Sequence, residues 1–276
     1  MPDIIKDIPI DGQGKIECSV GILTFNNAEI LSATLESVKD FAQIIICDGG
    51  STDSTIDIAK EFDCTIILQD KKFKREDGKI KDFAGVRNQM LDTANYKWFF
   101  CLDSDEILVP ELVTEIKEIV QVNKPTAFWV PRKYVIDEKI VDCATTYPSR
   151  QMRLFHLDAV NRYIKTIHER IELKTGALVS GLKNFMLIPM TTNTKAIQKK
   201  WDYYIDLEEE RVGDITLRRW IMTCMENLKI STLYLFRLLR NSLFCSGNRM
   251  PIKLELQRHL YHINICKRFW GRIKSF

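Results

Sequence analysis

The first half of the chain alternates short apolar runs with amphipathic segments. The apolar runs are residues 16–24, 43–50, 64–69 and 97–103, and the intervening segments with helical spacing are 29–41, 55–62 and 83–95. A short continuous apolar run is typical of a buried parallel strand. Strands that alternate with helices build βαβ units with right-handed crossovers. This half is therefore predicted to form an α/β fold around a parallel sheet.

The pattern changes after Pro110 and again near residue 195. Residues 111–122 predict an amphipathic helix, 126–136 and 138–143 predict strands, and 150–173 predict more irregular β structure. From residue 195 the chain has helical spacing, in segments 199–214, 217–244 and 251–270. No apolar stretch of about 18 residues lacks charge, so no transmembrane helix is predicted. We expect one α/β domain over 1–194 and a helical region over 195–276.

Composition indicates an ordinary globular chain. It has 276 residues, of which 45% are hydrophobic and 28% charged. None of the eight cysteines forms a CxxC pair, and four of them lie in or beside apolar runs. This usage predicts reduced, buried thiols in a cytosolic protein rather than a disulfide framework or a zinc site. Residues 1–15 lack an apolar core of signal-peptide length, so no secretory signal is expected.

The net charge of +3 is unevenly distributed. Residues 195–276 contain 16 Lys and Arg against 8 Asp and Glu, which gives +8 and leaves 24 − 29 = −5 for residues 1–194. A basic segment on an acidic body indicates an anionic partner. Its arginines are interleaved with Leu, Phe and Tyr, which favours a lipid interface over nucleic acid. The alternative is an amphipathic helical domain with a solvated basic face.

One stretch, FFCLDSDE at 99–106, ends an apolar run with acidic residues. Open α/β sheets bind ligands at the carboxyl ends of their strands. Asp103 and Asp105, two residues apart, suit Mg²⁺ or Mn²⁺, which take one or two protein carboxylates and complete their coordination with water and phosphates. The simpler alternative is a strand end followed by a helix cap.

Five short elements stand in order between Ile16 and Leu173. They are Thr24-Phe25-Asn26-Asn27, Asp48 to Thr55, Arg87-Asn88, the acidic stretch above, and Arg153-Leu154-Phe155 followed by His168-Glu169. In this order the chain resembles family 2 glycosyltransferases of the GT-A fold. Within that family it is most similar to the bacterial lipopolysaccharide-core and surface-glycan glucosyltransferase type. Its C-terminal portion departs from the Gly- and Asp-containing helical segment of that subgroup, which leaves the acceptor open.

The resemblance implies a fold, a reaction and partners. The fold would be a GT-A domain, a Rossmann-like and mostly parallel sheet with flanking helices, over 1–194, with a helical region over 195–276 that contacts acceptor or membrane. The reaction would be metal-dependent, inverting transfer of a sugar from a UDP- or GDP-sugar to a glycan or lipid-linked acceptor. We expect the protein to be cytoplasmic and peripheral at the inner face of an anionic membrane, with no nucleic-acid partner.

For the metal, Mn²⁺ or Mg²⁺, the resemblance makes Asp105 the direct ligand and brings Asp103 nearer the ribose or a metal-bound water. It makes His168 a further ligand, since neutral imidazole binds Mn²⁺ acceptably. The alternative is that His168 is a structural histidine.

For the nucleotide, the resemblance assigns Asp48 to the base or ribose and Thr24 and Asn27 to the flanks of the base. Arg87 is a candidate diphosphate partner because a guanidinium group matches phosphate oxygens. The alternatives are a turn-forming role for Asp48 and a surface ion pair for Arg87.

An inverting reaction needs a base for the acceptor hydroxyl, and a carboxylate within hydrogen-bond reach would serve. Glu169 and Glu106 both qualify by location, and we prefer Glu169 because Glu106 can open the next helix. Two other functions compete with this one. A glycosyltransferase-like binding protein is disfavoured by the intact acidic residues. A sugar-phosphate nucleotidyltransferase would need a Gly-rich basic loop, which TFNNAEILS at 24–32 lacks.

Overall fold

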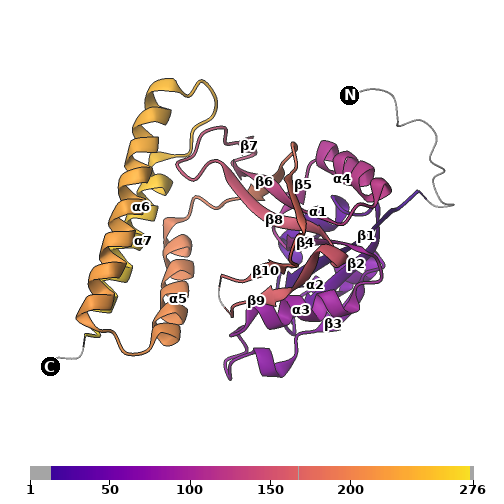
Figure 1. Cartoon of the computed structure of the whole chain (residues 1–276), viewed down its shortest axis with the longest axis horizontal. Coiled ribbons are helices and arrows are strands. Elements are labelled where there is room, and N and C mark those ends of the chain that lie inside the picture. The colour runs from indigo at the N-terminus through magenta and orange to yellow at the C-terminus, as the bar shows by residue number, and fades with distance from the viewer. Residues whose placement is uncertain (1–13, 167, 274–276) are drawn as a thin grey trace. The chain divides into compact units, whose positions relative to one another are not determined.

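A computed structural model describes residues 14–166 and 168–273 (Figure 1). The chain divides into two compact units. The first contains the described residues up to Pro131 together with Arg150–Met186. The second contains Arg132–Ser149 and Leu187–Phe276, so residues 132–149 belong with the C-terminal helices although the sequence boundary falls near 195.

A ten-stranded sheet organises the α/β part. Its order is β3-β2-β1-β4-β8-β6-β12-β5, with β7 and β11 paired to β6 outside this path. The strands are β1 (Ile16–Thr24), β2 (Phe41–Asp48), β3 (Thr65–Leu68), β4 (Trp98–Asp103), β5 (Ile107–Leu108), β6 (Thr126–Ile136), β7 (Lys139–Ile140), β8 (Ser149–His156), β11 (Leu178–Gly181) and β12 (Met186–Pro189). A separate antiparallel pair joins β9 (Val160–Ile164) to β10 (Arg170–Leu173). The strands β3, β2, β1 and β4 are parallel neighbours, as predicted.

Helices cover both faces of this parallel core. They are α1 (Ala28–Glu36), α2 (Thr55–Glu61), α3 (Phe83–Thr93) and α4 (Pro110–Val122), with short 3-10 turns η1 (Lys71–Phe73) and η2 (Leu157–Ala159). One apolar cluster joins α1, α2 and α4 to alternate residues of β1 and β4. A second joins α3 to the opposite face, where Phe99 and Phe155 stack at 5.6 Å between ring centroids. The α/β class with a mostly parallel sheet and a helical C-terminal region is confirmed.

The expected elements and the observed ones differ in the second half of the sheet. Strand β8 runs antiparallel to β4, with Phe99 opposite Phe155. Of the strand expected over 138–143, only β7 forms, because Val141 leads into a loop whose backbone pairs with Asn248. The short strands β5, β11 and β12 have no sequence signal of their own. Because the strands with which they pair are distant in sequence, the periodicity of apolar residues does not reveal these three strands.

Three helices form most of the second unit: α5 (Thr194–Val212), α6 (Leu217–Phe244) and α7 (Ile252–Trp270). Asn193 caps α5 through hydrogen bonds from Lys195 and Ala196, and Thr216 caps α6 through Arg219. Two small apolar clusters hold the unit together. Within the described residues, no helix is long and apolar enough to cross a membrane. The N-terminal segment in which no secretory signal is expected lies almost wholly outside the described residues.

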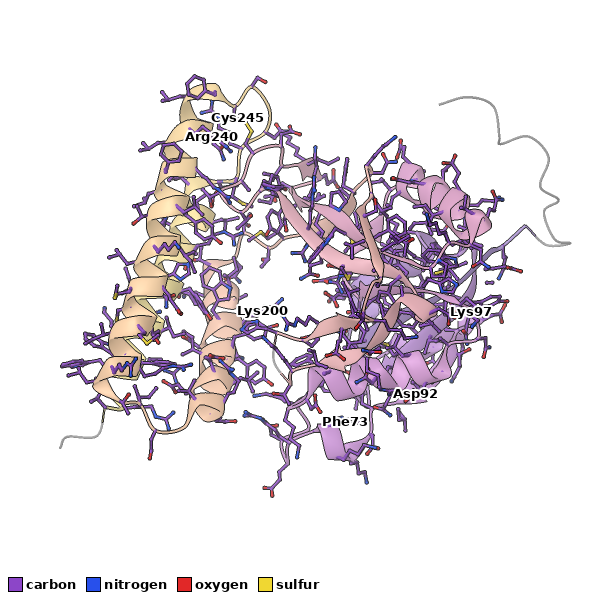
Figure 2. The ribbon with its side chains drawn as sticks, viewed as in Figure 1. Phe73, Asp92, Lys97, Lys200, Arg240 and Cys245 are labelled. Carbon is purple, nitrogen blue, oxygen red and sulfur yellow. A yellow bond between two sulfur atoms is a disulfide. The ribbon has the colours of Figure 1, made fainter. Side chains whose placement is uncertain are left out.

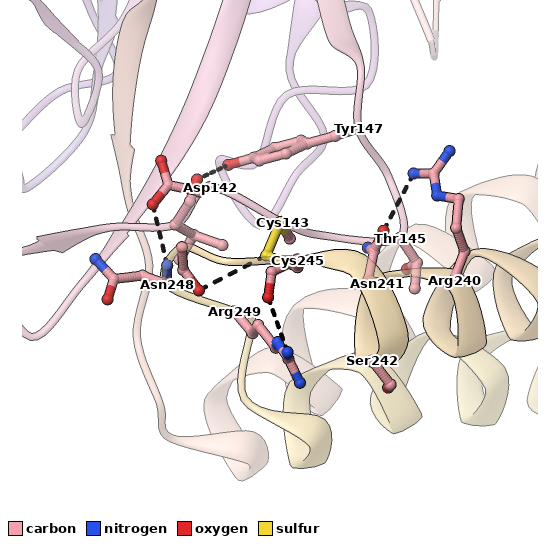
Figure 3. Close-up of a disulfide and its surroundings, with 12 residues drawn as sticks. Asp142, Cys143, Thr145, Tyr147, Arg240, Asn241, Ser242, Cys245, Asn248 and Arg249 are labelled. Atoms are coloured by element: carbon pink, nitrogen blue, oxygen red, sulfur yellow. Dashed lines mark hydrogen bonds between the residues drawn. A yellow bond between two sulfur atoms is a disulfide. The ribbon is translucent and has the colours of Figure 1, made fainter.

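The prediction that all cysteines are reduced is wrong for one pair. Cys143 and Cys245 form a disulfide with Cα atoms 6.4 Å apart (Figure 3), while the other six cysteines are free. Backbone hydrogen bonds bring the two segments together, since Asp142 and Cys143 both donate to the Asn248 carbonyl. The two cysteines are 102 residues apart in sequence, so no local pattern could reveal the bridge.

The disulfide should be detectable by alkylation. Denaturing the protein without reductant and alkylating it should modify six cysteines, whereas prior reduction should expose all eight. Because a bridge that closes a long loop restricts the unfolded chain, Cys143→Ser with Cys245→Ser should lower the free energy of unfolding by about 2–4 kcal/mol. The matched control replaces Cys224 and Cys266, which are free, with Ser. Eight alkylated cysteines without reductant would contradict the bridge.

Candidate active site

The carboxyl ends of β1, β2 and β4 meet at one edge of the sheet. Thr24, the last residue of β1, is in register with Asp48 at the end of β2. On the other side of β1, Leu23 is in register with Asp103 at the end of β4. The acidic strand ends therefore flank a shared central strand, at the edge where open α/β sheets bind their ligands.

Asp48 is the centre of a hydrogen-bonded turn. It is only 1% exposed. Its carboxylate accepts hydrogen bonds from the Thr24 hydroxyl at 3.0 Å, from the Ser51 hydroxyl at 2.6 Å, and from the backbone N–H groups of Gly50 and Ser51 at 2.7 Å each. Gly50 adopts φ of 90°, a conformation suited to glycine. These contacts fix the loop after β2 to the end of β1.

Asn27 plays a related part after β1. Its side chain accepts a hydrogen bond from the Phe25 N–H at 2.9 Å, and its own N–H donates to the Thr55 hydroxyl at 2.8 Å. The Ser51 hydroxyl also receives the Asn26 N–H at 2.8 Å. The loops after β1 and β2 are thus bonded to each other, and they bring together Thr24, Asn27 and Asp48, three of the predicted nucleotide-binding residues.

Asp103 is bound by two arginines. Arg87, from α3, donates to its Oδ1 at 2.9 Å, and Arg153, from β8, donates to its Oδ2 at 2.7 Å. Both guanidinium groups are nearly inaccessible, with side chains 8% and 5% exposed. Burial opposes ionisation of Asp103, but the charges of Arg153 and Arg87 outweigh that effect and hold the pKa of this carboxyl well below its usual range.

The two candidate bases belong to the same ion-pair network. Glu169 accepts a hydrogen bond from Arg87 Nε at 2.7 Å, and its side chain is 17% exposed. Glu106 is 3% exposed in its side chain, and it accepts from Arg153 at 3.0 Å and from the Asp103 N–H at 3.0 Å. The network therefore runs from Glu169 through the arginines and Asp103 to Glu106.

The two predicted metal ligands occupy different environments. Asp105 is half-buried in the turn after β4. His168 is exposed in the loop between β9 and β10, with φ of 54°. Among residues 14–166 and 168–273, no three His, Cys, Asp or Glu side chains gather closely enough to hold a metal ion by themselves. A carboxylate and an imidazole still fit a metal that takes its remaining ligands from water and a diphosphate.

The first unit also contains a surface pocket of about 460 Å³. Residues of α3 and β9 line it, including Gly85, Asn88 and Tyr163. None of the predicted site residues is among the lining residues. Two of its lining residues, Lys165 and Thr166, come just before His168 in the loop that carries it, and the Tyr163 ring centroid lies 5.9 Å from the Arg87 guanidinium.

Sequence reasoning missed the role of Arg153. The motif marks it only as the first residue of an Arg-Leu-Phe element, although it is 4% exposed and pairs with both Asp103 and Glu106. A signal was present, because Arg153 precedes Leu154 and Phe155 in a strand that buries all three. Arginine is almost never buried without a partner, so its position predicts a buried acid nearby.

Comparison with known proteins gives the family. Residues 19–172, more than half of the chain, match Glycosyl transferase family 2. The chain therefore belongs to glycosyl transferase family 2. This stretch contains every predicted site residue, from Thr24 to Glu169.

Individual relatives share only part of their length with this chain. The SPbeta prophage-derived glycosyltransferase SunS of Bacillus subtilis is 29% identical over 150 residues, which are 54% of this chain and 33% of SunS. The chondroitin synthase of Escherichia coli is 30% identical over 140 residues, 49% of this chain and 19% of that enzyme. The chain thus spans a third or less of these relatives. S. aureus TarS 1-349, solved with UDP-GlcNAc, is similar with TM-score 0.45 and 13% identity, covering 94% of this chain and 82% of that one.

The buried arginine should be important for stability. Arg153→Met should lower the free energy of unfolding by about 3–5 kcal/mol, because Glu106 would remain buried without its cationic partner. The measurement is urea denaturation. Arg162→Met is the matched control, since Arg162 pairs with Asp92 on the surface and an exposed pair contributes about 0–1 kcal/mol. Equal losses in the two variants would contradict a special role for the buried network.

Proposed function

We propose that this protein is a metal-dependent, inverting glycosyltransferase that moves a sugar from a nucleoside diphosphate donor to a glycan or lipid-linked acceptor. The observation that carries the proposal is that Asp48 and Asp103 end the two strands that flank β1, with Asp105 in the turn directly after Asp103, inside the region matched by the family. The strand ends form the edge at which α/β sheets hold nucleotides.

The donor nucleotide, UDP or GDP, would lie over the joined loops after β1 and β2. Asp48 shapes this place mainly through the turn it holds, since Thr24, Gly50 and Ser51 already donate to its carboxylate. Asp48 and Thr24 therefore fix the wall against which the base and ribose pack. Asn27, half-buried at the start of α1, completes that wall.

Asp105 and His168 are the residues that would hold Mn²⁺ or Mg²⁺ together with the donor phosphates. When bound, the cation would offset the negative charge that develops on the departing nucleoside diphosphate. Asp103 has a different task. Its carboxylate receives both arginines, so it positions the end of β4 and the turn that carries Asp105. In the proposal Asp103 is nearer to the ribose or a metal-bound water than to the metal itself.

The role proposed for Arg87 changes in view of its contacts. Its three guanidinium nitrogens donate to Glu169, to the Cys101 sulfur and to Asp103. A buried guanidinium with three protein partners is not poised to receive a diphosphate. We therefore assign Arg87 to positioning Glu169 and Asp103.

Glu169 is the proposed base that takes the proton of the acceptor hydroxyl. Arg87 engages its Oε1 and orients the side chain, while the residue stays partly accessible. Glu106 is nearly inaccessible, and its two oxygens receive Arg153 and the Asp103 N–H. This difference in access favours Glu169, because a base must come within hydrogen-bond reach of its substrate.

The proposal also concerns the class of acceptor. A cell-surface polysaccharide or lipopolysaccharide precursor is consistent with the Arg153 and His168-Glu169 elements of the sequence. The names of SunS and chondroitin synthase do not specify a lipopolysaccharide-core enzyme. The proposed acceptor class is therefore a glycan or lipid-linked glycan.

The function is tested by hydrolysis of a panel of UDP- and GDP-sugars with Mn²⁺, Mg²⁺ or chelator. One donor should be hydrolysed slowly in the absence of acceptor, and only with metal. Asp105→Asn should reduce this rate at least 100-fold, whereas Asp158→Asn, an exposed acid paired with Lys97, should not change it. If no donor is hydrolysed, the proposed activity of the chain is refuted. If Asp105→Asn keeps a rate within tenfold of wild type at saturating metal, the role proposed for Asp105 is refuted.

The base assignment is tested by comparing Glu169→Gln with Glu106→Gln. Glu169→Gln should reduce kcat by about 10²–10⁴-fold with little change in KM, since a base acts in the transition state. Gln keeps an oxygen for Arg87, so the fold should persist. Glu106→Gln should mainly lower the melting temperature. A normal kcat for Glu169→Gln combined with a large loss for Glu106→Gln would reverse the assignment.

A further inference from the structure

Helix α6 has an unusual distribution of side chains. It is 28 residues long, yet Asn241 is its one buried residue. Its large apolar side chains are exposed, with Leu228 at 68%, Leu239 at 65% and Leu243 at 75%. The remaining exposed members are Leu217, Ile221, Met222, Met225, Ile230, Leu233, Leu235, Phe236 and Phe244. An exposed apolar area of this extent marks an interaction surface.

The side of α6 that contacts α7 is polar and aromatic instead. Ser231 and His259 are 2.5 Å apart, and Asn227 and His262 are 2.6 Å apart. Trp220 packs against Trp270 with ring centroids 4.7 Å apart. The helix therefore keeps polar groups for its protein partner and presents aliphatic groups outward, the reverse of an ordinary surface helix.

Helix α7 carries a second exposed apolar stripe, made of Ile252, Leu256, Leu260 and Ile263. On both helices stripe residues directly follow contact residues, as Leu228 follows Asn227 and Ile263 follows His262. One residue corresponds to a rotation of about 100°. The two helices are antiparallel. Moving one residue past the contact line therefore turns towards the same side of the hairpin on α6 and on α7. Leu228, Leu239 and Leu243 of α6 therefore lie on the same side as Leu256, Leu260 and Ile263 of α7, and we call this side the hairpin face.

Basic residues border the hairpin face. Arg218, Lys229 and Arg240 follow one another at intervals of eleven residues, close to three turns of about 3.6 residues, so they form a row along α6. All three are exposed, and Figure 2 labels Arg240 on this helix. Lys253 and Lys267 are exposed on α7. The sequences of the two helices contain only two acids, Glu226 and Glu255, and Glu255 is 2% exposed.

Two residues of α6, Trp220 and Arg237, donate hydrogen bonds to backbone carbonyls of the second unit. Trp220 donates to the Cys266 carbonyl at 2.9 Å, and Arg237 donates to the Thr145 carbonyl at 3.0 Å. Neither belongs to the hairpin face. The basic row on α6 is therefore Arg218, Lys229 and Arg240.

We propose that the hairpin face docks onto the anionic surface of a lipid bilayer, with its apolar residues in the headgroup region and its basic row on lipid phosphates. Amphipathic helices with an apolar stripe bordered by Lys and Arg lie in this way at membrane interfaces. Charge complementarity selects this occupant. A second copy of the chain that used the same face would bring two basic rows together, with Glu226 as the one exposed acid that each copy's α6 and α7 could offer. The proposal is independent of the transfer reaction, and its test needs no substrate.

The test is co-flotation with vesicles of phosphatidylglycerol or phosphatidylcholine. Wild type should float with phosphatidylglycerol vesicles, bind phosphatidylcholine weakly, and dissociate in part at about 0.5 M salt, where charges are screened. Since each basic residue near an anionic leaflet strengthens binding roughly fivefold, Arg218→Ser with Lys229→Ser and Arg240→Ser should lower the partition coefficient about 100-fold. The matched control is Lys195→Ser with Lys199→Ser and Lys200→Ser, which removes the same charge from exposed positions of α5.

A third variant, Leu228→Gln with Leu239→Gln and Leu256→Gln, should also lose binding, because apolar burial contributes to interfacial docking. Circular dichroism and sedimentation velocity check that each variant folds and report its mass. Three results would overturn the proposal: no flotation of wild type, equal loss in the α5 control, or a dimer of wild type that the leucine variant dissolves. The last would assign the hairpin face to a second copy of the chain.

Discussion

Two buried guanidinium groups converge on the carboxylate of Asp103, and the arrangement of the site depends on them. Arg87 comes from α3, which packs on one face of the sheet, and Arg153 comes from β8, the antiparallel neighbour of β4. A buried charge without a partner costs several kcal/mol, so every member must be in place at once. The helix, the antiparallel strand and the turn after β4 are therefore held in one register. Glu106 and Glu169 complete the network at its two ends.

A second buried carboxylate, that of Asp48, fixes the part of the site formed by the ends of β1 and β2. Asp48 accepts one hydrogen bond from Thr24 at the end of β1 and three from the loop after β2, so the ends of β1 and β2 form one rigid wall. A ligand that binds against such a wall meets side chains already held by their neighbours, so little reorganisation is needed. His168 contrasts with this rigidity, because it is exposed in a loop and adopts a left-handed backbone conformation. The candidate site thus combines fixed groups at the strand ends with an exposed imidazole on a loop.

The family match ends at residue 172, and the helices α5, α6 and α7 lie beyond it. In these helices polar side chains make internal contacts and many apolar side chains are exposed. The α6–α7 contact uses polar pairs such as Ser231 with His259, while a disulfide ties Cys245 at the end of α6 to Cys143. Aliphatic side chains remain on the outside. Apolar groups gain free energy when removed from water, so a face of this kind is built for a partner rather than for solvent.

The sequence by itself determined the local elements and the acidic strand ends. The helix predicted over 217–244 is observed as Leu217–Phe244, and Asp48 and Asp103 end strands as expected. The periodicity of apolar residues, and the acidic residues that follow an apolar run, can be recognised within a short stretch of sequence. These predictions therefore succeeded. The antiparallel β8, the role of Arg153, the Cys143–Cys245 bridge and the packing of 132–149 with the C-terminal helices were decided by the tertiary structure alone. Each joins residues far apart in the chain, and whether a buried charge or thiol finds its partner depends on packing that no local pattern encodes.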